Sequence, residues 1–484
     1  MKTNRLILST LFICGLSVFT SCSDTKDNPA SNQSDRDERV VFEDQFSKDL
    51  QAMADDFRFD AATKAVATVK EFIDVLDENA LAEKTVSIVS TLVQGLQANT
   101  LDAYPEQDRE AAITCLKERF SMTDQDIQQM PGIFVVDAYK SIGKMKLDFK
   151  DGQCDITNDA EAFTIVSTNS QGETQTLALT FNDERDGICF FVARLAETTP
   201  IAIQLPKSIG ITLTTPRGEI INGTINLTTI DADQSKFVNF KVSGWMADGK
   251  LIANVNNRQE SASLYIKHTE SRAFDLNAAF AINGKEMARL DINDMHDSYT
   301  DEEINSEEFM QMREMGPFFS GAYDILKALK GKSVDNVVIT MNDNMVIDGS
   351  VDDIAKSLLA LGNVRKLYGT QPGMETIDKY TQELNSLVHF TVSQKNTGIT
   401  AQGTLQTAIK NQQEGEYQPV VALRFKGETE AKPMFARMTQ TDQENYKKMF
   451  DNFSPLIAEV SETLIVARKK GEAIVTAFKN YFAN

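Results

Sequence analysis

The sequence has few of the residues from which common catalytic sites are built. It contains 3 histidines among 484 residues, and a Ser/His/Asp hydrolase needs a positioned imidazole. It has no GxSxG, GxGxxG or phosphate-loop pattern, and no Cys/His spacing typical of a zinc site. We therefore expect a protein that binds without catalysis and needs no cofactor, although active sites can also assemble from residues far apart in the sequence.

Basic residues are also scarce relative to acidic ones. There are 49 Lys and Arg residues against 70 Asp and Glu residues, so the net charge is −21. A body of that sign repels nucleic-acid phosphates and anionic lipid headgroups, and neither is an expected partner. No segment after the N-terminus is apolar and long enough to cross a bilayer.

The N-terminus carries the most informative motif of the chain. Lys2 and Arg5 precede an apolar run, Leu6–Phe19, which is followed by small residues and Cys22. A basic start, a short apolar run and small residues before the cleavage site are typical of a secretory signal peptide. The run is shorter than the roughly 20 residues that a membrane-spanning helix needs.

The end of this segment resembles the lipobox of bacterial lipoproteins. The resemblance implies that Cys22 is lipidated and becomes the first mature residue, so that the protein meets the membrane through its lipid. Ser23, and not Asp, follows the cysteine. In this family that difference implies sorting to the outer membrane, on its periplasmic or its cell-surface face. The alternative is an ordinary cleaved signal peptide with an incidental cysteine.

The periodicity of apolar residues divides the rest of the chain into segments. After a signal peptide at 1–22, the pattern predicts a flexible tether at 23–41, helices at 42–140, an antiparallel sheet at 141–295, helices with a small hairpin at 296–387, strands at 388–428 and C-terminal helices at 440–482. Residues 42–484 would form one large body or two intimate subdomains.

Several local signals sharpen the helix predictions. Phe59, Val66, Ile73 and Leu76 follow helical spacing and indicate a helix with one buried face. Capping residues and glycines predict two helices at 300–315 and 318–330. Ser454-Pro455 predicts the start of the last helix, because proline suits the first helical position.

Turn dipeptides punctuate the sheet segment. Asp151-Gly152, Asp248-Gly249 and Asn283-Gly284 each predict a hairpin turn between alternating strands. Ile188–Ala193 is apolar at every position, which predicts a central strand covered on both faces. The connections are short, so an antiparallel meander is expected.

These segments together predict an α+β fold. A large antiparallel β-sheet would pack against the N-terminal, central and C-terminal helices. Helices lying in a curved sheet would resemble the half-barrel of periplasmic lipid and lipoprotein carriers. That resemblance is one of architecture, and no shared motif supports it.

An acidic cluster is the candidate metal site. Asp291, Asp294, His296 and Asp297 offer hard oxygen ligands for Ca²⁺ and one nitrogen for a transition metal. Their spacing matches no EF-hand loop. A solvated loop followed by a helix cap is the alternative interpretation.

Two further groups of residues are candidates for specific roles. Cys154 and Cys189 lie in β-patterned sequence, whereas Cys115 lies in a helical stripe, so a Cys154–Cys189 disulfide is predicted. Phe274, Leu276 and Phe280 alternate along one strand and would line an apolar cavity if the sheet holds a ligand.

Three functions stay open at this point. The first is a non-enzymatic envelope lipoprotein that binds a protein partner or scaffolds an assembly. The second is a carrier of an apolar, lipid-like ligand in a cavity between sheet and helices. The third is a hydrolase whose polar residues converge only in the fold. The size and lining of the pocket would separate them.

Overall fold

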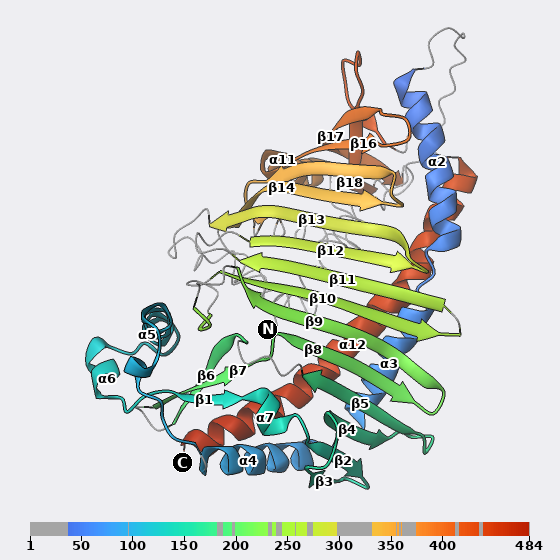
Figure 1. Cartoon of the computed structure of the whole chain (residues 1–484). Coiled ribbons are helices and arrows are strands. Elements are labelled where there is room, and N and C mark those ends of the chain that lie inside the picture. The colour runs from blue at the N-terminus through green and yellow to red at the C-terminus, as the bar shows by residue number, and fades with distance from the viewer. Residues whose placement is uncertain are drawn as a thin grey trace. The chain divides into compact units, whose positions relative to one another are not determined.

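The computed structural model describes residues 37–94, 96–181, 187–195, 199–230, 235–238, 244–256, 258–268, 274–297, 332–354, 356–357, 360, 374–411, 416–434 and 439–483. These residues form helices and a large, mostly antiparallel sheet, which confirms the predicted α+β fold (Figure 1). Cys22, the tether up to residue 36 and the helices predicted at 300–315 and 318–330 lie outside them.

The chain divides into two units. Unit 1 takes the described residues of Met1–Arg58, Ala273–Ala279 and Glu286–Asn452, and unit 2 takes those of Phe59–Arg272, Phe280–Lys285 and Phe453–Asn484. The hydrogen-bonded order of the large sheet has 16 strands.

Unit 2 contains one half of this strand order and a separate small sheet. Its part of the order is β11-β10-β9-β8-β5-β4-β2-β3, and the small sheet has the order β1-β7-β6. The strands are β1 (Phe134–Asp137), β2 (Lys146–Lys150), β3 (Gln153–Thr157), β4 (Phe163–Thr168), β5 (Thr174–Phe181), β6 (Cys189–Leu195), β7 (Thr199–Gln204), β8 (Ser208–Thr215), β9 (Gly218–Thr229), β10 (Trp245–Val255) and β11 (Arg258–His268).

The helices of unit 2 provide the apolar surface that covers these strands. They are α3 (Asp60–Asp74), α4 (Glu78–Gln94), the short 3₁₀ helix η1 (Leu101–Ala103), α5 (Glu106–Phe120), α6 (Asp124–Gln129), α7 (Ala138–Ile142) and the part of α12 (Gln440–Ala483) from Phe453 onward.

Two apolar cores fill unit 2. In one, Phe72 and Leu76 at the end of α3 pack with Leu147 and Phe149 of β2 and with Leu213 of β8. In the other, α5 and α6 pack against the small sheet. The stripe predicted from Phe59 to Leu76 is buried at its two ends only, because Val66 and Ile73 are half-buried. The residues that α3 buries are Ala61, Ala65 and Phe72, so part of the buried face lies one position before the predicted one.

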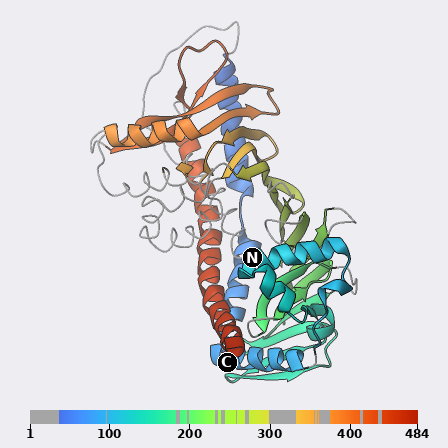
Figure 2. The ribbon, with the colours of Figure 1, turned by 90° about the vertical axis from the view of Figure 1, so that its left-hand side faces the viewer.

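Unit 1 contains the other strands and, where the structure describes the chain without gaps, two helices that lie entirely within it. The strands are most of β12 (Phe274–Ile282), β13 (Lys285–Asp297), β14 (Lys332–Met341), β15 (Met345–Val351), β16 (Val388–Gln394), β17 (Thr400–Asn411), β18 (Glu416–Arg424) and β19 (Lys432–Pro433). Helix α11 (Met374–Leu387) packs against β16, β17 and β18 (Figure 2). Helix α2 (Glu38–Asp56) begins inside the range predicted as tether.

Some predicted turns are confirmed and one is wrong. Asp151-Gly152 and Asn283-Gly284 have positive φ angles and close hairpins. Asp248-Gly249, in contrast, lies within β10, which pairs along its length with β11 and over most of it with β9. The chain turns instead near Asn256, whose φ is 51°. Pairing with two long neighbours outweighs a local turn signal here.

Two parallel pairs interrupt the predicted antiparallel meander. The hairpin partner β3 occupies one edge of β2, and β4 pairs in parallel with the other edge. Strand β1 pairs in parallel with β7. Short links rule out parallel pairing only between strands that follow each other directly in the chain. Here β3 lies between β2 and β4 in the sequence, so β2 and β4 can pair in parallel.

The prediction of a central strand at Ile188–Ala193 is wrong. Strand β6 lies at the edge of the three-stranded order β1-β7-β6. Ile188, Cys189 and Phe191 are still buried. A segment covers that edge, since the backbone N–H of Cys189 donates to the carbonyl of Lys236 at 2.7 Å and Phe237 stacks on Phe191.

The last helix does not begin at Pro455. Helix α12 starts at Gln440, where the side chain of Thr439 accepts from the backbone N–H of Asp442, and continues past the proline. Proline removes one backbone donor from a helix interior, but the turns on either side keep their own bonds. No helix within the described residues combines the length and apolar character that crossing a bilayer requires.

Candidate functional site

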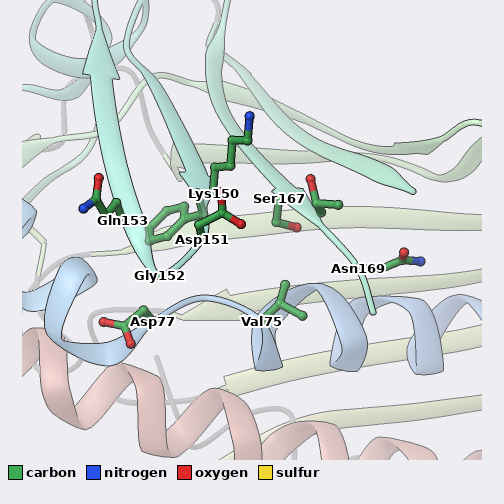
Figure 3. A pocket seen from close by; sticks show the side chains of 10 residues that line it. Val75, Asp77, Lys150, Asp151, Gly152, Gln153, Ser167 and Asn169 are labelled. Carbon is green, nitrogen blue, oxygen red and sulfur yellow. The ribbon is translucent and has the colours of Figure 1, made fainter. Parts of the chain in front are cut away.

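A pocket of about 330 Å³ lies at one end of the apolar core of unit 2. The hairpin of β2 and β3 and the end of β4 form one side of it, and the link between α3 and α4 forms the other (Figure 3). The sheet side is lined by Phe149, Lys150, Asp151, Gly152, Gln153, Ser167, Thr168 and Asn169, and the helix side by Val75 and Asp77.

Local turns fix the walls of the pocket. Asp151 and Gly152 have φ angles of 53° and 76°, which is the left-handed conformation that a tight two-residue hairpin requires. The Oδ1 of Asn169 accepts from the backbone N–H of Glu173 at 2.8 Å and shapes the β4–β5 turn. The Oδ1 of Asp77 accepts from the backbone N–H of Ala80 at 2.8 Å and caps the first turn of α4.

Ser167 is the unusual residue of this site. Its side chain is 1% exposed, yet its hydroxyl has no hydrogen-bond partner among the described residues. In the sheet register Phe149 lies beside it on β2 and Gln175 lies beside it on β5. The Oε1 of Gln175, which is 2% exposed, also lacks a partner in the described part of the chain. Two unsatisfied polar groups thus lie side by side at the edge of an apolar core.

The charged residues of the pocket lie at its rim. Lys150 and Asp151 are exposed, and the structure gives neither of them an ion pair with another described residue. Figure 3 shows both on the same side of the pocket as Ser167, across from Val75 and Asp77. The lining is therefore polar at the rim and part of the floor, with an apolar wall from Phe149 and Val75.

The pocket offers polar contacts without an activated nucleophile. A serine becomes a nucleophile when a base accepts its proton, and the hydroxyl of Ser167 contacts no such group among the described residues. The thiol of Cys154 on β3 is buried, and this burial raises its pKa to about 11. It is therefore a neutral thiol near pH 7.

The candidate metal residues lie on a strand and not in a loop. All four belong to β13, which pairs with β14. The carboxylate of Asp291 accepts from Asn277 at 2.8 Å and from Arg289 at 2.9 Å. The structure describes the backbone of Asp294, His296 and Asp297 but not their side chains. No group of three metal-binding side chains occurs among the residues that it describes.

The candidate ligand residues Phe274, Leu276 and Phe280 lie on β12, as predicted, and none lines the pocket. Leu276 is buried, and the ring of Phe280 packs on that of Phe59 with centroids 4.7 Å apart. These contacts are those of core residues.

The predicted Cys154–Cys189 disulfide is not formed. Both residues are free and buried, and they belong to the two different cores of unit 2. Burial raises the pKa of Cys189 to about 12. The β-pattern of their sequences is correct, but it does not specify which layer of the fold each strand joins.

His268 is buried and packs against a neighbouring strand. His268 on β11 is opposite Trp245 on β10, and the two rings stack with centroids 6.0 Å apart. His389 is exposed, with its Nε2 3.4 Å from the Oδ2 of Asp352. Neither lines the pocket.

Two buried ionic groups connect elements of the same unit. In unit 2, the carboxylate of Glu260 on β11 accepts from the backbone N–H groups of Ala61 and Ala62 at 3.2 and 2.7 Å, at the start of α3, and from Arg258 at 2.6 Å. In unit 1, the guanidinium of Arg39 on α2 donates to both oxygens of Glu428, at 2.7 and 2.8 Å. These bonds account for both carboxylates without a ligand.

A weak signal in the sequence could have identified Ser167, which lines the pocket, and its neighbour Gln175 as buried polar residues. Phe163, Ile165 and Ser167 share one face of β4 by simple alternation, and Gln175 shares a face of β5 with Leu177. A polar residue that ends an apolar stripe of period two is thus a candidate for a buried polar group. Threonines on the other face hide this signal.

Comparison with models of protein families, with curated proteins and with solved structures finds no match.

Proposed function

We propose that this chain is a cell-envelope lipoprotein that acts by binding and not by catalysis, and that the lipid on Cys22 anchors it to the outer membrane. The observation that carries the proposal is the pocket of unit 2, which presents polar groups and a buried hydroxyl that no base among the described residues contacts. The acidic body, with a net charge of −21, suits a soluble domain on a lipid tether.

The packing of unit 2 favours this function over transport of an apolar ligand. A carrier needs a cavity between its sheet and helices, whereas α3 and α4 pack directly on the strands through residues such as Phe72, Leu81 and Leu147. The pocket next to this core also has a polar floor and rim. A lipid chain would leave those polar groups unsatisfied.

Two measurements on the purified full chain test the mode of action. The first is a screen for turnover of esters, glycosides and peptides, and the second is mass spectrometry of co-purified lipid. We expect neither turnover nor stoichiometric lipid. Turnover that Ser167→Ala abolishes would establish a hydrolase, and stoichiometric lipid beyond the covalent anchor would establish a carrier.

A substitution tests the anchor separately. Cys22→Ala removes the thiol that would carry the lipid, so the variant should lose its lipid and leave the membrane fraction. Cys154→Ala is the matched control, because that cysteine is a buried thiol of the folded body. A Cys22→Ala variant that still carries lipid and still sediments with the outer membrane would contradict the anchor.

A further inference from the structure

The starting point is Ser167, a lining residue of the pocket whose buried hydroxyl has no hydrogen-bond partner among the described residues. Native proteins satisfy nearly all buried polar atoms, so each exception points to a missing partner, which is a ligand or an ordered water. Gln175, its neighbour in the β4–β5 register, is a second such exception but is not among the lining residues of the pocket. A hydroxyl both donates and accepts, so a ligand group that can do the same, such as another hydroxyl, satisfies Ser167.

The charges on the lining decide the charge of the ligand. Asp77, Asp151 and Lys150 give the pocket one cation and two anions, and the whole chain carries −21. An anionic ligand would be repelled. A cation at Ser167 would have no carboxylate of the described residues directly beside it, because Asp151 lies at the exposed rim and Asp77 lies across the pocket, where it caps α4. Burial of a charge without an adjacent counter-charge is costly. A neutral ligand avoids both penalties.

The size and the apolar wall restrict the ligand further. A volume of about 330 Å³ is at the small end of ligand pockets, which span roughly 300–1,000 Å³. Phe149 and Val75 provide an apolar surface on which a carbon framework can lie. The volume is also several times the roughly 30 Å³ that one water molecule occupies in the liquid.

We infer that the pocket of unit 2 binds a small, neutral compound with several hydroxyl groups, such as a monosaccharide or a cyclic polyol, through the hydroxyl of Ser167. This inference rests on the proposed binding function and names the ligand class of its site. A hydroxyl group of the ligand exchanges a hydrogen bond with the Ser167 hydroxyl, and its C–H groups contact Phe149 and Val75.

Calorimetric titration of the purified full chain tests the ligand class. The neutral probes are glucose, N-acetylglucosamine and myo-inositol. The charged probes are glucuronate, an anion, and glycine, a zwitterion that carries one charge of each sign. We expect at least one neutral probe to bind, and Ser167→Ala to weaken it about 3- to 10-fold, as expected for one lost hydrogen bond. Neither charged probe should bind more tightly than the best neutral one.

A folding control separates loss of the ligand contact from loss of structure. Without probe, Ser167→Ala should melt at or above the temperature of the parent chain, because the hydroxyl it removes has no partner among the described residues. Ser357 is the matched buried serine, and its Oγ donates to the carbonyl of Asp353 at 2.7 Å. Ser357→Ala should melt lower and keep the affinity for the probe.

Each contrary result overturns the inference. No binding of any neutral probe at millimolar concentration would mean that water alone fills the pocket. Tighter binding of glycine or glucuronate would assign a charged ligand, and unchanged affinity in Ser167→Ala would place the ligand elsewhere. Without turnover in the enzymatic screen, these results leave the proposed binding function standing, whereas turnover overturns that function itself.

Discussion

Two buried glutamines, one in each unit, show how differently the molecule treats polar groups in its interior. Gln394 of unit 1 is 1% exposed, and its amide donates to the carbonyl of Phe42 at 2.9 Å and accepts from Thr397 at 3.1 Å. Gln175 of unit 2 is 2% exposed, and its Oε1 finds no partner among the described residues. In unit 1 the buried polar atoms of Gln394 connect elements. In unit 2 the Oε1 of Gln175, which neighbours the pocket residue Ser167 in the sheet, connects to no other described element.

Among the substitutions that test this comparison, we expect the largest loss of stability from breaking the ion pair between Arg39 and Glu428 in unit 1. Glu428→Ala removes the bidentate partner of Arg39, which is 5% exposed and whose carbon Cζ lies 4.7 Å from the centre of the Phe425 ring. Glu43, whose carboxylate lies 3.3 Å from the same guanidinium, stays in place. Breaking a buried ion pair costs on the order of 3–5 kcal/mol of unfolding free energy, and the remaining contact with Glu43 places the expected loss at the lower end of that range. Urea denaturation measures this loss.

An exposed pair supplies the matched control for that experiment. Glu472 pairs with Arg468 one helical turn away at 2.7 Å, and both side chains are more than half exposed. Glu472→Ala should change the unfolding free energy by no more than about 0.5 kcal/mol. Equal effects of the two substitutions would mean that the Arg39 pair contributes no more than a surface contact.

The carboxylate of Glu428 also predicts that the folded protein loses stability in acid. The hydrogen bond from Arg39 lowers the pKa of Glu428 to about 2, from an ordinary value of 4.5. A lowered folded-state pKa stabilises the fold above pH 4.5, and this contribution disappears as the pH falls towards 2. The step should amount to about 2–3 kcal/mol.

Denaturation curves between pH 7 and pH 2 measure this step. The Glu428→Ala variant should lose stability less steeply over the same window, because it lacks the group that titrates. Parallel curves for the two proteins would assign the acid sensitivity to other carboxylates.

The two glutamines themselves give the smallest and sharpest comparison. Gln394→Leu leaves the Phe42 carbonyl without its buried donor and should cost about 1–3 kcal/mol. Gln175→Leu removes an oxygen that already lacks a partner among the described residues, so the unfolding free energy of the variant should be unchanged or higher. Thermal melting of both variants measures this difference in stability. A Gln175→Leu variant that is destabilised as much as Gln394→Leu would mean that both amides are structural.

Alternation and turn residues predicted much of the sheet, because they are local properties. The strand pair that became β14 and β15, and the turn at Asn283-Gly284, follow from period two and from residues that tolerate positive φ. Asp248-Gly249 misled the prediction because the neighbouring strands β9 and β11, distant in sequence, hold that segment extended. Pro455 misled it because a single lost donor does not end a long helix.

The candidate site was harder to predict than the fold. Ser167 becomes a buried hydroxyl only because Phe149 from β2 and Gln175 from β5 lie on its two sides, and this register is a property of three strands together. Asp291 drew attention as part of an acidic cluster, yet in the fold it accepts from Asn277 and Arg289 on its own sheet. The composition showed where acidic residues cluster, but the pairing of the strands determined which groups Asp291 contacts.

The cap on α3 has a consequence for the order in which the chain folds. Phe59 at the N-cap position makes no side-chain hydrogen bond, and the first turn is completed by Glu260, 199 residues later than Ala61. A chain that emerges from the ribosome or from an export channel with its N-terminus first presents α3 long before β11. The first turn of α3 therefore keeps free N–H groups until this long-range contact closes, and contacts of such separation form slowly. Folding of unit 2 must wait for a residue near the end of its sheet to complete a helix at its beginning.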